Sequence, residues 1–232
     1  MADSPSRPPD DTDTLSAAEL RQRLDDAFVQ VRLAARVEAA PDGTALDLTL
    51  LTAGRMPFDR DPAQANTWLT ENGIDAIATF NECMDIVIRL RTAEAVHRLT
   101  SLLLGSRIVT HAAAAALVGT LAPHALRYEV AVPGAGQIRL FLHDSAGEKT
   151  VPAFAALLGG PGIEADLDLS RARGIRRITD RLSWLLTGIT GSLVPAQGTP
   201  GCTHEPDQVE LYLDPDQAQL LAQRLNRPNA PD

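Results

Sequence analysis

Cysteine is scarce in this sequence, which holds only Cys83 and Cys202 among its 232 residues. The two stand far apart in the chain, so they provide no disulfide framework. Cys202 and His204 offer two of the four ligands that a structural zinc ion needs, and no second pair completes the set. We therefore expect two free thiols and no bound metal or other cofactor.

Catalytic motifs are missing as well. The sequence has no G-x-S-x-G nucleophile elbow and no glycine-rich loop that ends in G-K-S or G-K-T. His143, Asp144 and Ser145 are neighbours in the chain, but a catalytic triad is assembled by the fold and not by adjacency. These absences favour a protein that is not an enzyme.

Basic residues are fewer than acidic ones, 21 against 30, and Lys149 is the only lysine. The net charge of -9 repels phosphate backbones and anionic lipids and attracts basic proteins. No apolar leader and no uninterrupted apolar run of about 18 residues is present. We expect a cytoplasmic protein that binds neither nucleic acid nor membrane, and the arginine- and alanine-rich composition indicates a GC-rich bacterial source.

The sequence does have enough hydrophobic residues, 44%, to build a core. Residues 1–15 are rich in Pro, Ser and Asp and are predicted to be a disordered tail. In residues 16–106, apolar periodicity and capping residues predict the order α-ββ-α-ββ-α. The predicted helices cover 16–27, 61–72 and 92–104, and the predicted strands cover 29–38, 46–50, 74–80 and 84–90, with a turn at 41–43.

Residues 107–227 are predicted to form a second half with a similar order, followed by a tail at 228–232. The class is therefore α+β, with antiparallel sheets flanked by helices and an internal duplication as one explanation. This element order resembles dimeric secretion-chaperone-type domains, in topology alone. The predicted helices cover 110–121, 151–158, 170–186 and 214–225, and the predicted strands cover 126–132, 137–143, 163–169 and 209–213.

Three acidic residues, Glu164, Asp166 and Asp168, alternate along the predicted strand 163–169. Their carboxylates would project from one face, and carboxylate oxygens are ligands for Mg²⁺ or Ca²⁺. A straight row of carboxylates does not wrap an ion, however. The simpler interpretation is a solvated strand face that neighbouring arginines compensate.

The helix after that strand is the most basic segment of the chain. Arg171, Arg173 and Arg176 lie in its first turns, where Ser170 is predicted to cap it and where an anion would be favoured. Phosphate or carboxylate binding is therefore one hypothesis for these arginines. The other is a structural helix whose charges are paired with the nearby acids.

Met56 and Phe58 stand in a segment whose turns do not require apolar side chains. They are candidates for a partner anchor, because exposed methionine and aromatic side chains favour interfaces. The alternative is that both side chains pack into the core.

The leading hypothesis is a non-enzymatic protein-interaction module, an adaptor or chaperone-like component. Its partner would be a protein, with a basic one favoured by the net charge, and self-association stays open. A small-molecule-binding regulatory domain, with Arg171, Arg173 or Arg176 contacting an anionic group, is the second hypothesis. An enzyme that uses Glu164, Asp166 and Asp168 with a divalent ion is the third.

Overall fold

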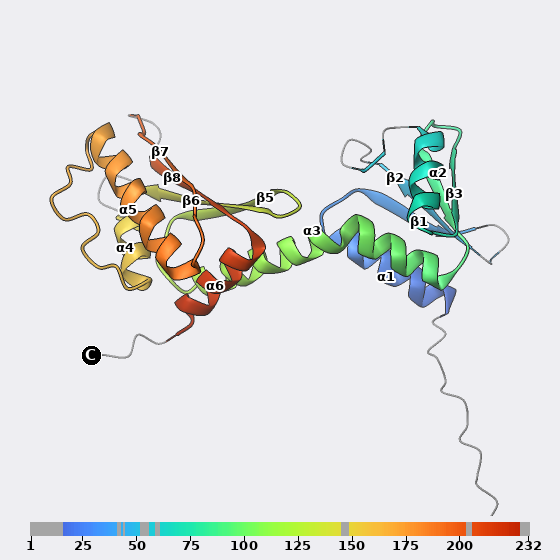
Figure 1. Ribbon diagram of the computed structural model, residues 1–232, viewed down its shortest axis with the longest axis horizontal. Helices are drawn as coiled ribbons and strands as arrows, with labels where there is room; N and C mark the ends of the chain where they lie inside the picture. Colours follow the sequence, from blue (N-terminus) through green and yellow to red (C-terminus); the bar gives the residue numbers. More distant parts are fainter. Residues whose placement is uncertain are drawn as a thin grey trace, which may run out of the picture. The chain divides into compact units, whose positions relative to one another are not determined.

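The protein consists of two compact units, Met1–Gly105 and Ser106–Asp232, in a computed structural model. The structure describes residues 16–40, 43, 45–51, 56–58, 61–144, 149–202 and 206–227. These form six helices and eight strands arranged as two antiparallel four-stranded sheets (Figure 1). The predicted α+β class with helix-flanked sheets is confirmed. The predicted tails, Pro41 and Asp42 of the predicted turn, Ser145 and His204 lie outside the described residues.

The first unit has its strands in the spatial order β1-β2-β4-β3. Its elements are α1 (Ala17–Gln30), β1 (Ala35–Ala39), β2 (Leu46–Leu50), α2 (Pro62–Glu71), β3 (Ala76–Phe80), β4 (Ile86–Leu90) and the first part of α3 (Ala93–Leu121).

Local capping chemistry sets where the helices of the first unit begin. The Ser16 hydroxyl accepts the Glu19 N–H at 3.3 Å, and the Glu19 carboxylate accepts the Ser16 N–H at 2.8 Å, which completes a capping box. Asp61 caps α2 by accepting the Ala63 N–H at 2.9 Å, and Pro62 occupies the first helical position. Both helix starts are therefore as predicted.

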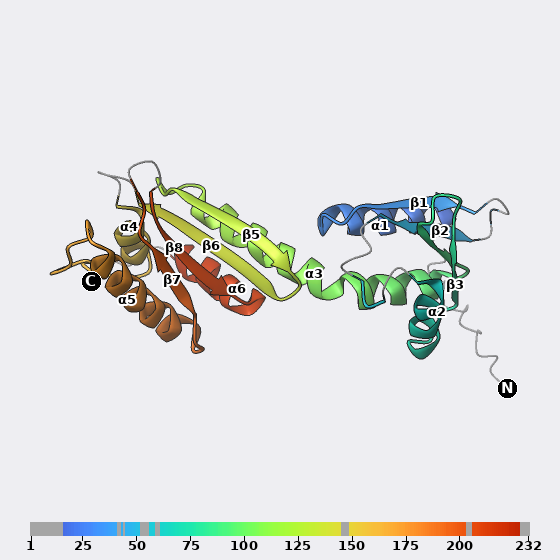
Figure 2. The ribbon, with the colours of Figure 1, turned by 90° about the horizontal axis from the view of Figure 1, so that it is seen from above.

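Alternation along the strands builds the first core. Leu48 and Ile88, which face each other in register on β2 and β4, are completely buried. Phe28 of α1 and Leu99 of α3 are buried as well, and the two helices run along the same side of this sheet (Figures 1 and 2). The opposite face of the sheet carries the polar set of the alternation, as in an antiparallel sheet with one covered side.

The outer edge of β3 is covered by α2 through one side chain. The Asn66 carboxamide donates to the Ala78 carbonyl at 2.9 Å and accepts the Ala78 N–H at 2.8 Å. It therefore pairs with the backbone as a neighbouring strand would, and it satisfies edge groups that would otherwise be open. No described element pairs with the outer edge of β1.

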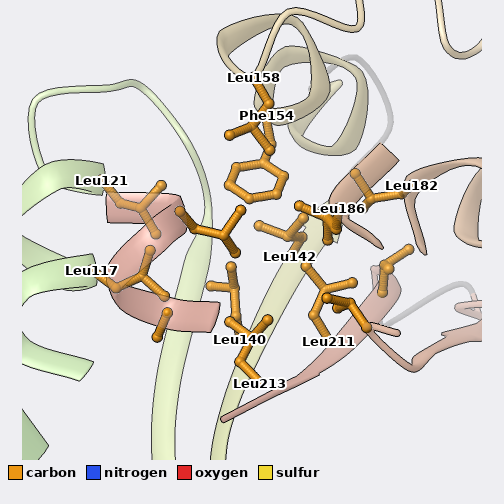
Figure 3. Close-up of a cluster of buried hydrophobic side chains, with 14 of the residues drawn as sticks. Leu117, Leu121, Leu140, Leu142, Phe154, Leu158, Leu182, Leu186, Leu211 and Leu213 are labelled. Carbon is orange, nitrogen blue, oxygen red and sulfur yellow. The ribbon is translucent and has the colours of Figure 1, made fainter. Parts of the chain in front are cut away.

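The second unit repeats the strand order, as β5-β6-β8-β7. Leucines of the last part of α3 and of β6, α5 and β8, together with Leu158 directly after α4, gather around Phe154 of α4, which is fully buried (Figure 3). The shared order is consistent with the predicted duplication, which stays a prediction. The remaining elements are β5 (Tyr128–Gly134), β6 (Gln137–Asp144), α4 (Thr150–Leu157), α5 (Ala172–Thr190), β7 (Ala196–Thr199), β8 (Asp207–Leu213) and α6 (Pro215–Leu225).

The predicted helices 92–104 and 110–121 are in fact one helix, α3. Gly105 lies inside it, because glycine in a helix interior lowers stability without ending the helix when the turns on both sides pack. Thr110 does not cap a helix, because its hydroxyl donates to the Ser106 carbonyl one turn earlier. Among the described helices α3 is the one long and apolar enough to cross a membrane by length and composition, and its buried leucines belong to both cores.

Three strand predictions were also wrong in part. The strand expected at 29–38 begins only at Ala35, because α1 continues to Gln30 and a turn with Arg32 at φ 52° follows it. Val31 and Leu33 are buried within that turn, which is why the sequence alternates there. The predicted strand 163–169 consists of turns, and β7 was missed because its Ala-Gln-Gly-Thr sequence carries no apolar alternation.

Candidate protein-interaction surface

The helix α5 separates its apolar and basic residues cleanly. Ile175, Ile178 and Leu182 are buried, as their helical spacing predicts. Leu186 completes the buried stripe in place of the expected Leu185, which is only half-buried. The arginines lie on the other side, where Arg181 is half-buried and the others are exposed. The helix begins at Ala172 with Arg171 at the N-cap, so the predicted Ser170 cap is wrong by one residue and no side chain caps this end.

The segment before α5 folds back tightly against the first turn of the helix. A Cβ atom on Gly174 would lie 1.9 Å from the Asp168 carbonyl oxygen, so only glycine fits at this position. Arg181 fixes the same segment from the helix side, by donating to the Ile163 carbonyl at 2.9 Å and the Ala165 carbonyl at 3.0 Å. The start of α5 is therefore held rigidly by its own chain.

Two of the arginines are used within the unit. Arg181 forms an ion pair with Asp166 at 3.2 Å, and Arg171 forms one with Asp168 at 2.8 Å. The pKa of Asp168 is lowered, chiefly because the Ser170 hydroxyl and N–H donate to its carboxylate, with a smaller contribution from Arg171. These contacts follow the structural alternative for Arg171, which the sequence analysis had left open.

Three further arginines of α5, Arg173, Arg176 and Arg177, are exposed and form no ion pair with any described residue. Trp184 lies 77% exposed on the same helix. Because an α-helix turns by 3.6 residues, Arg173, Arg177 and Trp184, at spacings of four and seven, lie along one stripe. The exposed Asp180 lies on the same stripe, between Arg177 and Trp184. We call Arg173, Arg176, Arg177 and Trp184 the basic-aromatic face.

A shallow hollow of about 240 Å³ opens at one end of this face. Arg173 and Arg177 contribute to its lining, together with the paired Asp168 and Arg171. Two carboxylates in the lining, Asp166 and Asp168, counteract the positive charge inside it. Arg173 and Arg177 form no ion pair with any described residue, so positive charge remains inside the hollow as well as on the helix surface beside it.

The predicted row of carboxylates does not exist as a row, because residues 163–169 form turns. Asp166 contacts Arg181 and Asp168 contacts Ser170, while Glu164 Oε2 is buried without a hydrogen-bond partner. The described residues contain no group of three or more His, Cys, Asp or Glu side chains that could hold a metal ion. The geometry gives no support to a metal site at these acids.

Met56 and Phe58 differ in their placement. Phe58 is buried, with its ring centroid 5.7 Å from that of Trp68, whereas Met56 is half-buried. The packing of Phe58 follows the core alternative, so this side chain offers no exposed anchor. Cys83 and Cys202 are both free and exposed, as expected.

His143 and Asp144 are not brought together, because successive residues of a strand point to opposite faces. Asp144 instead accepts the Val151 N–H at 3.0 Å and so caps the start of α4. Its pKa is raised, mainly by burial and also by Asp207, which lies opposite on β8; the backbone N–H groups of Val151 and Thr150 and the charge of Lys149 oppose this shift.

Sequence reasoning missed Trp184. The available signal was a tryptophan off the apolar stripe of the predicted helix, three residues after Arg181 and eleven after Arg173. The chain matches no known protein-family model, no curated protein and no solved structure.

Proposed function

We propose that this protein is a non-enzymatic interaction module, an adaptor or chaperone-like component of a bacterial cytoplasmic system, and that its basic-aromatic face binds an acidic segment of a partner protein. The observation that carries the proposal is the 77% exposed Trp184 beside arginines that have no acidic partner among the described residues.

Tryptophan and arginine are the residues that most often dominate the energy of protein interfaces. Here both types stand on a helix whose start is fixed by Gly174 and Arg181, so little ordering is needed on binding. The stripe from Arg173 to Trp184 covers eleven helical steps, about 16 Å, which matches roughly five residues of an extended peptide. A peptide with carboxylates at one end and an apolar side chain at the other fits that arrangement.

The second unit is less acidic than the first, so its net charge opposes an acidic partner at this face only weakly. Of the 30 acidic residues, 17 precede Ser106, against 10 of the 21 basic ones, so most of the negative charge belongs to the first unit. The basic partner expected from the net charge stays a prediction for that unit. In the alternative, a regulatory small molecule in the hollow, an anionic group would contact Arg173 and Arg177, and Asp166 and Asp168 would oppose it in part.

The test uses Trp184 itself as the reporter. The chain has two tryptophans, so a Trp68→Phe background leaves Trp184 as the single fluorophore. We expect saturable binding of an acetylated peptide Glu-Glu-Ser-Ser-Leu, weakened about 10-fold or more by Arg173→Glu with Arg177→Glu, since interfacial charge reversals commonly cost over 1.4 kcal/mol. Trp184→Ala, followed with a labelled peptide, should weaken binding by about 30-fold.

Arg227→Glu is the matched control, because it makes the same kind of charge change at an exposed arginine outside α5. It should leave the affinity unchanged, and a peptide with Lys in place of Glu should not bind. Added salt should weaken binding of the acidic peptide. The proposal would be overturned if Arg173→Glu with Arg177→Glu and Trp184→Ala left the peptide affinity unchanged. Tighter binding of a single-stranded oligonucleotide would also overturn it.

A further inference from the structure

The outer edge of β1 exposes backbone groups of alternate residues. The Leu51 N–H donates to the Ala34 carbonyl at 3.1 Å, and the Ala40 N–H donates to the Ala45 carbonyl at 2.9 Å. Together with the register of β1 on β2, these bonds show that the even-numbered residues of β1 form the backbone hydrogen bonds with β2. The N–H and C=O groups of Ala35, Val37 and Ala39 therefore point away from the sheet.

Two opposite charges on β1 lack a partner in their own sheet. Arg36 and Glu38 are exposed on the outer face and form no ion pair with any described residue. Glu38 lies directly opposite Asp47 in register, a like-charge pair. Arg89 is engaged with Asp47 alone, through two bonds of 2.8 and 2.9 Å.

A second copy of the same strand would supply what is missing. If two β1 strands pair in antiparallel fashion about a two-fold axis at Val37, Val37 faces Val37 and Ala35 faces Ala39. Each Arg36 then lies opposite the Glu38 of the other copy. These two positions form the non-hydrogen-bonded pairs, in which side chains approach most closely.

We infer that the first unit self-associates through β1, so that two four-stranded sheets join into one continuous sheet of eight strands. The two new Arg36–Glu38 pairs give Glu38 the cation that its own sheet does not provide. The small side chains of Ala35 and Ala39 allow the strands to approach without a clash. A five-residue edge buries less than the roughly 1,200 Å² of stable complexes, so the dimer is weak and concentration-dependent.

The edges of β3 and β5 do not share this self-complementarity. The edge of β3 is occupied by Asn66, as described above. In β5 the same pairing about Val130 would place Glu129 opposite Ala131, so it would create no ion pair. The second copy of β1 is therefore the occupant that the charges on β1 fit best.

Charge reversal tests the register directly. Sedimentation velocity at rising protein concentration should show a monomer–dimer equilibrium for the wild type. Arg36→Glu alone and Glu38→Arg alone should each raise the dimer dissociation constant about 10-fold or more, because both cross-strand pairs become repulsive. The double variant Arg36→Glu with Glu38→Arg should recover the dimer, which also shows that the reversals do not unfold the unit.

An equimolar mixture of the two single variants gives the sharpest result. One chain then carries two acids and the other two arginines on β1, so a mixed dimer should form although neither variant pairs with itself. Ala39→Pro should abolish the dimer, since it removes an outward N–H without breaking the ladder with β2. Glu129→Arg on β5 is the control and should have no effect.

A wild type that stays monomeric, or an Arg36→Glu dimer of undiminished strength, would overturn the inference. So would loss of the dimer in Glu129→Arg, because β5 of another chain would then be the partner. A mixed sample that remains monomeric would exclude the proposed register.

Discussion

The two units share one strand order but differ in how their outer sheet faces are charged. In the second unit Arg139 lies 3.3 Å from Glu210 and 5.5 Å from the centre of the Tyr212 ring, so its charge is compensated across neighbouring strands. In the first unit Asp47 and Arg89 are paired, yet Arg36 and Glu38 on the edge strand are not. The first unit thus differs from the second in carrying, on one edge strand, two opposite charges that form no ion pair with any described residue.

The helices that cover the edge strands β3 and β7 differ as well. In the first unit α2 covers β3 by two hydrogen bonds from Asn66. In the second unit α5 approaches β7 so closely that a Cβ atom on Gly198 would lie 2.5 Å from the Thr179 hydroxyl. A helix that covers a strand by packing must be long and amphipathic. The polar side of α5 therefore faces solvent and carries the basic-aromatic face.

The largest change that would break this comparison is Gly174→Ala. The new Cβ atom would overlap the Asp168 carbonyl, so α5 must move away from the preceding segment, and we expect a loss of about 3 kcal/mol in unfolding free energy. Gly188→Ala in the same helix is the matched control. It meets no atom within 4 Å and should stabilise by about 0.5–1 kcal/mol. Urea denaturation followed by circular dichroism measures both; equal effects would refute the close approach.

A smaller effect is expected from Asn66→Ala in the first unit. It leaves the N–H and C=O groups of Ala78 without their partner and should cost about 2 kcal/mol. In a Trp184→Phe background, the fluorescence of Trp68 reports the unfolding of this unit alone. Glu71→Ala, an exposed position of the same helix, should change the midpoint little. A stable Asn66→Ala protein would show that the edge of β3 needs no cover.

The smallest effect concerns Asp144, whose pKa is raised in the folded state by burial and by Asp207. A raised pKa means that the folded state binds the proton more tightly than the unfolded chain, so ionisation lowers stability as the pH rises above 3.8. Asp144→Asn keeps the acceptor for the Val151 N–H and should therefore stabilise the second unit near neutral pH. Denaturation at a series of pH values should show this gain vanishing below that pH; a constant gain would point to another cause.

Much of the fold could be predicted because local chemistry dictated it. The Ser16–Glu19 capping box, the Asp61-Pro62 helix start and the alternation of Leu46, Leu48 and Leu50 act over a few residues and are visible in the sequence. The strand predictions were wrong where tertiary contacts of a turn, and not a strand, buried the apolar side chains. Residues 31–33 and 163–169 alternate like strands, but their apolar side chains reach the cores from turns.

The candidate surface was predictable only in part. The arginines at the start of α5 were identified, but which of them are paired depends on the return of residues 163–168 over the helix, and this return rests on Gly174 and Arg181. The exposure of Trp184 likewise follows from the rotation of α5 on the core. A sequence shows that a tryptophan lies off an apolar stripe, but not whether another element covers it.

The sequence by itself determined the α+β class, the helix caps and the central strands, because periodicity and capping act between residues close in the chain. Only the tertiary structure decided the strand order, the continuity of α3 and which charges stay without partners. Those properties depend on register and on contacts between distant segments. The exposed charges of Arg36 and Glu38 and the basic-aromatic face of α5 belong to that second group.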